Sequence, residues 1–381
     1  MNPKKNYPNV LLNEDWWKSA VFYQIYPRSF YDSNNDGIGD LQGVTKKLDH
    51  LNDGNGGGLG IDAIWFSPFF TSPQADFGYD VSDYCNIDED YGTLEDFDNL
   101  VDEAHKRNIK VVLDLVLNHS SDQHEWFKES RSDSTNPKAD WYVWVDPDPD
   151  GNPPNNWLAV FGGAAWTYEP QRQQYYLHNF LPEQPDLNWY NPEVREALAE
   201  VIRFWMNRGV DGFRLDTANY YAFDRQLRDN PKRQEGNEIL EDGQEANPLS
   251  AYITKYSKDR PENLEFIKYL RKIFDEKKHI TSIGEIGSGE GLDSTLKLGA
   301  DYVKGKEGLH LAYTFALLSE KMNANYFDNV TKITEEAIED GWPCWSLSNH
   351  DCKRMMTRYK CFDEREGYQQ MILLLMISLR G

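Results

Sequence analysis

Short apolar runs alternate with amphipathic stretches along most of the chain. Seven of the runs are predicted to be strands: residues 21–26, 61–67, 110–117, 212–215, 280–284, 309–315 and 345–348. Helical patterns lie between them, for example at residues 94–107, 192–207 and 262–278. Strands that alternate with helices predict a parallel sheet with right-handed crossovers. A closed barrel of eight strands would need one more strand and helix than this pattern provides.

Two long stretches interrupt the alternation. Residues 120–185 are rich in Asn, Pro, Asp and Trp, which predicts a separate insertion after the third strand. Residues 220–260 form a second long loop after the fourth strand. Loops that follow barrel strands form the rim where substrates bind, so both stretches are expected at that rim.

Size and charge narrow the class of protein. A chain of 381 residues suits a barrel with an insertion. A net charge of −23 repels nucleic acids and anionic membranes, so neither is an expected partner. The polar N-terminus has no apolar signal region, and the longest apolar run, residues 371–379, is too short to span a bilayer. Four cysteines without disulfide or zinc spacing then predict reduced thiols and a cytoplasmic location.

Three carboxylates come directly after predicted strands. They are Asp216 in GFRLDTAN, Glu285 in GEI and Asp351 in SNHD. In a barrel of parallel strands, a side chain at this end of a strand reaches the catalytic rim. Three acidic groups there suit the hydrolysis of a sugar acetal, which needs a nucleophile, an acid and a stabiliser of positive charge.

The neighbours of two carboxylates suggest their ionisation. Arg214 and Asp216 point the same way along a strand, so Arg214 is expected to hold Asp216 by charge-assisted hydrogen bonds and keep it ionised. Glu285 lies between a glycine and an isoleucine, where burial would raise its pKa and let it donate a proton. His119 and His350 also follow strands. Each segment alone equally suits a structural ion pair, a buried glutamate, a capped turn or a structural histidine.

The order and strand positions of these motifs together resemble glycoside hydrolase family 13, the α-amylase superfamily. The resemblance covers nearly all of residues 15–381 and includes GDLQGV at 39–44 and QPDLNW at 184–189. The QPDLN form is similar to the oligo-1,6-glucosidase and α-glucosidase branch. Further segments typical of bacterial α-glucosidases are DFGYD at 76–80, NPKADW at 136–141, PPNNW at 153–157, FGG at 161–163 and YYLHNF at 175–180.

The resemblance implies an α/β fold, a (β/α)8 TIM barrel with a subdomain inserted after strand 3. The first part of the catalytic barrel is expected at residues 1–119, the inserted domain B at 120–185 and the second part of the barrel at 186–381. Family members continue into an eighth strand and a C-terminal β-domain, so this chain is expected to stop before strand 8. A missing strand leaves unpaired edges, and a chain of this length alone is expected to be poorly stable or inactive.

The family roles fall on matching positions. Asp216 would be the nucleophile, Glu285 the general acid/base and Asp351 the stabiliser of the transition state. The non-reducing glucose would be bound by Asp76, Tyr79, His119, Arg214 and His350. Retention of configuration would require the carboxyl groups of Asp216 and Glu285 about 5–5.5 Å apart. Thr217 resembles the residue of α-1,4-acting members at this position, although a β-branched residue also suits a strand end.

Residues 32–40, DSNNDGIGD, place oxygen ligands at alternate positions and include a glycine for a sharp bend. This spacing is typical of a calcium loop. The family resemblance implies a structural Ca²⁺ or Mg²⁺ ion held by the side chains of Asp32, Asn34, Asp36 and Asp40 and by the Ile38 carbonyl. A capped turn without metal is the alternative. No organic cofactor is expected.

The leading interpretation is a retaining, exo-acting α-glucosidase that releases glucose from short α-1,4-glucosides such as maltose through a covalent glucosyl-Asp216 intermediate. The alternatives are a transglucosylase or sucrose isomerase of the same family, or an inactive truncated fragment. A non-catalytic relative of amino-acid transporter heavy chains is disfavoured, because all three carboxylates are present and no anchor is visible. The expected partner is a small oligosaccharide or disaccharide, bound by a monomer or dimer.

Overall fold

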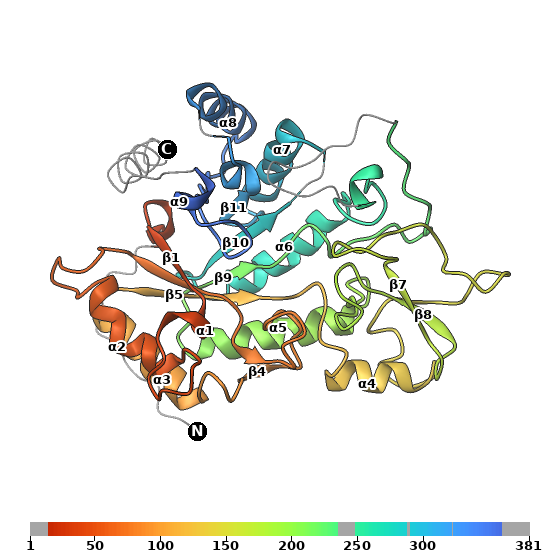
Figure 1. Cartoon of the computed structure of the whole chain (residues 1–381), viewed down its shortest axis with the longest axis horizontal. Helices are drawn as coiled ribbons and strands as arrows, with labels where there is room; N and C mark the ends of the chain where they lie inside the picture. Colours follow the sequence, from red (N-terminus) through yellow and green to blue (C-terminus); the bar gives the residue numbers. More distant parts are fainter. Residues whose placement is uncertain (1–13, 235–247, 288–289, 322, 360–381) are drawn as a thin grey trace.

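A curled parallel sheet forms the centre of the molecule (Figure 1). The computed structural model describes residues 14–234, 248–287, 290–321 and 323–359. Among them, six parallel strands follow one another in the order β1-β2-β5-β9-β10-β11. Their bounds are β1 Phe22–Ile25, β2 Ala63–Phe66, β5 Lys110–Leu115, β9 Gly212–Leu215, β10 Thr281–Ile286 and β11 Leu311–Thr314. Sheet order equals chain order, as the predicted crossovers of a (β/α)8 barrel require.

Helices cover the outer face of the sheet (Figure 1). They are α2 Leu41–Leu51, α3 Leu94–Lys106, α5 Pro192–Asn207, α6 Asn263–Phe274, α7 Leu292–Val303 and α8 Ala324–Ala337, with short α1 Pro27–Phe30 and α9 Met355–Arg358. α5 buries Val194, Leu198, Ile202 and Trp205 at the spacing of one helical face. Its start is set by the Asn191 side chain, which accepts a hydrogen bond from the first turn.

The predicted insertion has a small sheet of its own. It contains α4 Glu125–Ser132, β6 Trp144–Val145, β7 Trp166–Glu169 and β8 Gln174–Leu177, with the strands antiparallel in the order β6-β8-β7. Trp157, Trp166 and Leu177 form its core, against which Phe223 and Tyr256 of the second long loop pack. The two long loops therefore support each other beside the barrel, to the right in Figure 1. The exact domain boundaries stay a prediction.

The predicted strand at residues 345–348 is wrong. Within the part of the chain that the structure describes, one isolated bridge, between Ala312 and Pro343, continues the sheet past β11. Trp345 and Leu347 instead pack onto a small cluster around Phe327 on α8. Their apolar character therefore reflects this packing. Pro343, two residues before the segment, has no N–H to donate to a strand ladder.

Minor elements complete the described chain. They are the pair β3 Phe70–Thr71 and β4 Asp83–Ile87, and the 3₁₀ turns Trp16–Lys18, Pro248–Ala251 and Phe315–Leu318. No helix in the described ranges is long and apolar enough to cross a membrane. The apolar run at 371–379 and Cys361 lie outside the described residues.

Candidate active site

The register of the parallel strands brings polar side chains together inside the sheet. Asp114 on β5 pairs with Arg214 on β9, and Glu285 on β10 pairs with Tyr313 on β11. Paired residues of adjacent strands point to the same face, so these four side chains share the interior of the barrel. All four are buried.

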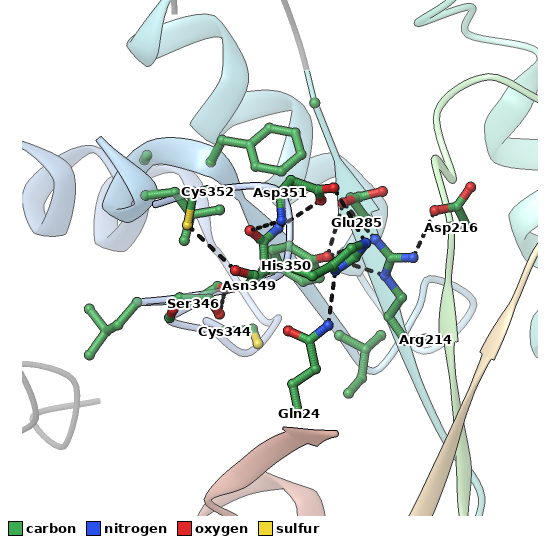
Figure 2. Close-up of a pocket in the computed structure, with 18 of the residues that line it drawn as sticks. Gln24, Arg214, Asp216, Glu285, Cys344, Ser346, Asn349, His350, Asp351 and Cys352 are labelled. Carbon is green, nitrogen blue, oxygen red and sulfur yellow. Dashed lines mark hydrogen bonds and ion pairs between the residues drawn. The ribbon is translucent and has the colours of Figure 1, made fainter. Parts of the chain in front are cut away.

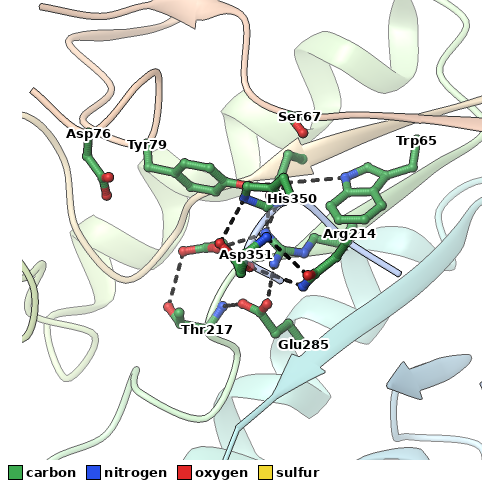
Figure 3. Close-up of polar contacts among 12 residues, drawn as sticks. Trp65, Ser67, Asp76, Tyr79, Arg214, Thr217, Glu285, His350 and Asp351 are labelled. Carbon is green, nitrogen blue, oxygen red and sulfur yellow. Dashed lines mark hydrogen bonds and ion pairs between the residues drawn. The ribbon is translucent and has the colours of Figure 1, made fainter. Parts of the chain in front are cut away.

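Arg214 is the centre of this cluster (Figure 3). Its Nη1 lies 2.8 Å from Asp114 Oδ1 and 2.7 Å from Asp216 Oδ1, and its Nη2 lies 2.6 Å from Glu285 Oε1. The Arg214 residue is only 1% exposed. One guanidinium group thus holds three carboxylates, and the two predicted catalytic acids occupy its two terminal nitrogens. The predicted contact of Arg214 with Asp216 is confirmed.

Thr217 links the same two acids from the other side. Its backbone N–H donates to Glu285 Oε2 at 3.1 Å, and its hydroxyl donates to Asp216 Oδ2 at 3.3 Å. Its φ angle is +41°, which a β-branched residue rarely adopts. Thr217 therefore does not continue the strand, and the interpretation as a simple strand-end residue is wrong. Backbone strain of this kind is typical of functional sites.

The shared guanidinium changes the expected ionisation of Asp216. Burial raises the pKa of the Asp216 carboxyl well above its usual range; Arg214 lowers this pKa, while the charges of Glu285 and Asp114 raise it. The 2.7 Å contact of Arg214 with Asp216 is the expected ion pair, while the ionisation of Asp216 stays a prediction. The sequence analysis did not identify Asp114, which shares this guanidinium group with Asp216 and Glu285. One buried cation facing three acids favours retention of a proton within the cluster.

His350 and Asp351 approach the cluster from the segment after α8 (Figures 2 and 3). His350 Nε2 lies 2.8 Å from the Tyr79 hydroxyl, and Gln24 on β1 reaches Nδ1 at 2.9 Å. Burial, together with Arg214, lowers the pKa of His350, which favours the neutral ring. The Asp351 side chain is 53% exposed, and partial burial with the nearby Glu285 charge raises its pKa to about 6.

Asp76 and His119 are joined by a residue of the insertion. Gln184 Nε2 lies 2.9 Å from Asp76 Oδ2 and 3.1 Å from His119 Nε2. Burial lowers the pKa of His119 to about 3, so this ring is neutral at physiological pH. The end of the insertion therefore orders one wall of the site.

All nine predicted catalytic and sugar-binding residues line one open pocket of about 2470 Å³. They are Asp76, Tyr79, His119, Arg214, Asp216, Thr217, Glu285, His350 and Asp351. Aromatic side chains of the two long loops, Phe161, Phe180 and Tyr220, line it as well. The predicted residues thus converge on one place, although their individual roles stay predictions.

Several residues of the site were not predicted. Asp114 accepts from Arg214 and also from the Tyr79 hydroxyl at 3.1 Å, and Trp65 Nε1 donates to it at 3.3 Å. Its signal in the sequence is a carboxylate inside an apolar run. Gln24 shows a similar signal, a polar residue within a strand. Tyr313 carries no such signal, because an aromatic residue is ordinary in a strand.

In the predicted metal loop, side chains accept hydrogen bonds from the backbone of the same loop. The Asp32 carboxylate accepts from the backbone N–H groups of residues 34, 35 and 37, and Asp40 accepts from Ser33 and Gly43, which makes it the N-cap of α2. The donors are all oxygen atoms, as Ca²⁺ or Mg²⁺ prefers, and a carboxylate oxygen that accepts one hydrogen bond retains a lone pair. Within the described ranges, however, no three His, Cys, Asp or Glu side chains are placed to hold a metal ion. The ion stays a prediction.

One family model and two known proteins match most of this chain. The family model of the α-amylase catalytic domain matches residues 24–381. A probable α-glucosidase of Rhizobium meliloti (strain 1021) is 50% identical over 371 residues, which are 97% of this chain and 66% of that protein. An oligo-1,6-glucosidase of Heyndrickxia coagulans is 41% identical over 361 residues, 91% of this chain and 61% of that protein.

Two solved structures also match most of this chain. The α-glucosyl transfer enzyme XgtA superposes with a TM-score of 0.90 at 49% identity, covering 96% of this chain and 66% of that chain. The trehalulose synthase MutB from Pseudomonas mesoacidophila MX-45 has a TM-score of 0.78 at 38% identity, covering 92% and 60%. The present chain thus spans between 60% and 66% of the length of these four relatives.

Proposed function

The chain belongs to glycoside hydrolase family 13, the α-amylase family, and from this premise we propose that it forms the catalytic part of a retaining, exo-acting α-glucosidase. The single observation that carries the proposal is that Arg214 forms ion pairs with both Asp216 and Glu285 at the wall of one pocket. Two carboxyls held by one guanidinium group suit the short separation of a retaining mechanism, about 5–5.5 Å.

In the proposed reaction Asp216 attacks the anomeric carbon of the non-reducing glucose while Glu285 protonates the glycosidic oxygen. The leaving sugar departs, and water then attacks the glucosyl-Asp216 ester as Glu285 takes the proton back. This cycle needs one proton on the pair, which an excess of buried carboxylates over cations supplies. During catalysis that proton must reside on Glu285.

The remaining pocket residues would bind and orient the sugar. Asp76, His119 and His350 present hydrogen-bonding groups that are already held by neighbouring side chains. Asp351, half exposed and in contact with His350 and Asn349, is the carboxylate that would stabilise the positive charge of the transition state. Preorganisation of this kind lowers the cost of ordering the site when the substrate binds.

Glucose release from maltose, isomaltose, sucrose and trehalose tests the proposal. We expect maltose to be the preferred substrate, and NMR of the first product to show the α-anomer. Asp216→Asn keeps the size of the side chain and should lower kcat by more than about 10³-fold, because the covalent step is lost. A wild-type protein that releases no glucose from any of the four sugars would refute it.

Transfer to a sugar or alcohol acceptor is the second candidate. It is favoured by the likeness to XgtA, which is named an α-glucosyl transfer enzyme. The likeness to a trehalulose synthase adds sucrose isomerisation as a further outcome. Product analysis at high maltose and at high sucrose separates the three reactions: glucose alone, longer glucosides or a rearranged sucrose.

We further propose that Ca²⁺ or Mg²⁺ binds Asp32, Asn34, Asp36, Asp40 and the Ile38 carbonyl. The ion would order the loop that precedes α2 and would take no part in the chemistry. This role is supported by the all-oxygen donor set and by the alternate spacing of the ligands.

A further inference from the structure

Tyr313 joins the arginine of the site to its acid/base. Resting on the proposed glucosidase function, we propose that the Tyr313 hydroxyl is a positioning group that dictates which oxygen of Glu285 delivers the proton. β11 runs parallel to β10, and the register places Tyr313 directly beside Glu285. The tyrosine side chain is buried, and its hydroxyl contacts Arg214 and Glu285.

The direction of its hydrogen bonds follows from chemistry. Arg214 Nε and Nη2 lie 3.2 Å and 3.0 Å from the Tyr313 hydroxyl oxygen, and a guanidinium group can only donate. The hydroxyl must therefore accept from Arg214, and its own proton is directed to Glu285 Oε1 at 3.0 Å. Burial raises the pKa of Tyr313 well above its usual value, so the phenol retains this proton.

The two oxygens of Glu285 consequently differ. Oε1 accepts from both Tyr313 and Arg214, the latter at 2.6 Å, whereas Oε2 accepts, among the described residues, from the backbone N–H of Thr217 at 3.1 Å. An oxygen that already accepts two hydrogen bonds, one of them from a cation, is the poorer place for a proton. Oε2 is thus the oxygen that carries the transferable proton toward the leaving group.

Several other charges surround Glu285, and one of them, Arg214, donates to this hydroxyl. Arg214 and Asp216 face it from β9 and its turn, Asp114 from β5, and His350 and Asp351 from the segment after α8. None of them is altered in a Tyr313→Phe variant. A change in the pH profile of that variant therefore reports the lost hydroxyl, including the loss of the acceptor for Arg214 Nε and Nη2.

The test compares two substrates with the same glucosyl group. Maltose needs a proton on its leaving oxygen, whereas α-glucosyl fluoride releases fluoride with little help from an acid. We expect Tyr313→Phe to lower kcat/KM about tenfold on maltose and less than about threefold on the fluoride. The basic limb of the maltose profile should move to higher pH, because the ionised acid/base loses a hydrogen-bond donor that stabilises its charge.

Tyr302→Phe is the matched control. Tyr302 is also buried and loses one hydrogen bond, at 2.6 Å from Asn263, but it does not touch the cluster. It should leave the ratio of the two substrates and the pH limb unchanged. If Tyr313→Phe does not fold, 3,5-difluorotyrosine at position 313 provides a stronger donor and should move the basic limb to lower pH.

The outcomes distinguish failure of the proposed Tyr313 role from failure of the proposed glucosidase function. Equal losses on both substrates, or an unshifted basic limb in the phenylalanine or the fluorinated protein, would overturn the role of Tyr313 alone. A wild-type protein without activity on either substrate would overturn the proposed glucosidase and this inference with it. A larger loss on maltose with the opposite pH shifts of the two variants supports it.

Discussion

Removal of the Arg214 cation should destabilise the fold in a way that depends on pH. Arg214 is buried and contacts three carboxylates at 2.6–2.8 Å, so Arg214→Gln leaves these acids without a cation. Removal of one partner from a buried ion pair costs about 3–5 kcal/mol. With an unfolding entropy of about 2.1 cal/mol/K per residue, a chain of this size should lose about 4–6 °C in Tm.

The sign of the pH dependence follows from the raised pKa values. Burial already raises the pKa of Asp114 and of Asp216, and loss of Arg214 should raise both further. A carboxyl whose pKa is higher in the folded than in the unfolded chain contributes stability at low pH that is lost as the pH rises through the folded-state pKa. The loss of Tm in Arg214→Gln should therefore be smaller at about pH 5 than at about pH 8.

Arg203 offers a matched control on the surface. It also contacts three carboxylates, those of Glu196, Glu200 and Glu276, at 2.6–2.8 Å, but its partners are 40–67% exposed. Arg203→Gln should cost no more than about 1 kcal/mol, or about 1 °C, at either pH. Thermal unfolding of both variants and the wild type at the two pH values decides the matter. Equal losses for both substitutions, or a deficit for Arg214→Gln that does not grow with pH, would refute the reasoning.

Three further predictions concern the pocket and the loop before α2. Partial burial raises the pKa of Asp351 to about 6, so kcat/KM for maltose should fall as the pH drops through about 6; initial rates that stay level down to about pH 4.5 would contradict this. Thr217→Val removes the hydroxyl that donates to Asp216 and should raise the ratio of isomaltose to maltose hydrolysis about tenfold; an unchanged ratio in a two-substrate assay would contradict a role in linkage preference. Saturating Ca²⁺ should raise the Tm of EDTA-treated protein by about 3 °C, from about 2.7 kcal/mol at 100 times the Kd, and Asp36→Asn should abolish the rise; identical melting with EDTA and with Ca²⁺ would favour a turn without metal.

The barrel strands were predictable because a parallel strand is buried on both faces and reads as a continuous apolar run. β5 and β9 show this clearly, since every residue of β9 and all but the first of β5 are buried. The same criterion failed at residues 345–348, where Trp345 and Leu347 are apolar because they pack against α8. Composition reveals burial but not the partner, so it cannot separate a strand from a packed loop.

The site was predictable to the level of which residues meet, but not of how they share protons. Asp216 follows β9, Glu285 lies near the end of β10 and Asp351 follows an apolar segment, and this chain order places them at one rim. Their ionisation depends on Asp114 and on Tyr313, which contact Arg214 through the register of neighbouring strands. Register is a property of the folded sheet, and no motif in the chain encodes it.

The attachment of the insertion has a consequence for engineering. Its last segment enters the sugar site through Gln184, which holds Asp76 and His119, and through the bridge of His119 with Asp186. A graft of this insertion from another family member would therefore replace part of the wall of the proposed glucose site, together with any specificity carried by the loop tips. Chimaeras in which the grafted segment ends before residue 184 would keep Gln184 of this chain and its contacts with Asp76 and His119. Chimaeras in which it ends after residue 184 would replace Gln184 with the residue of the other protein.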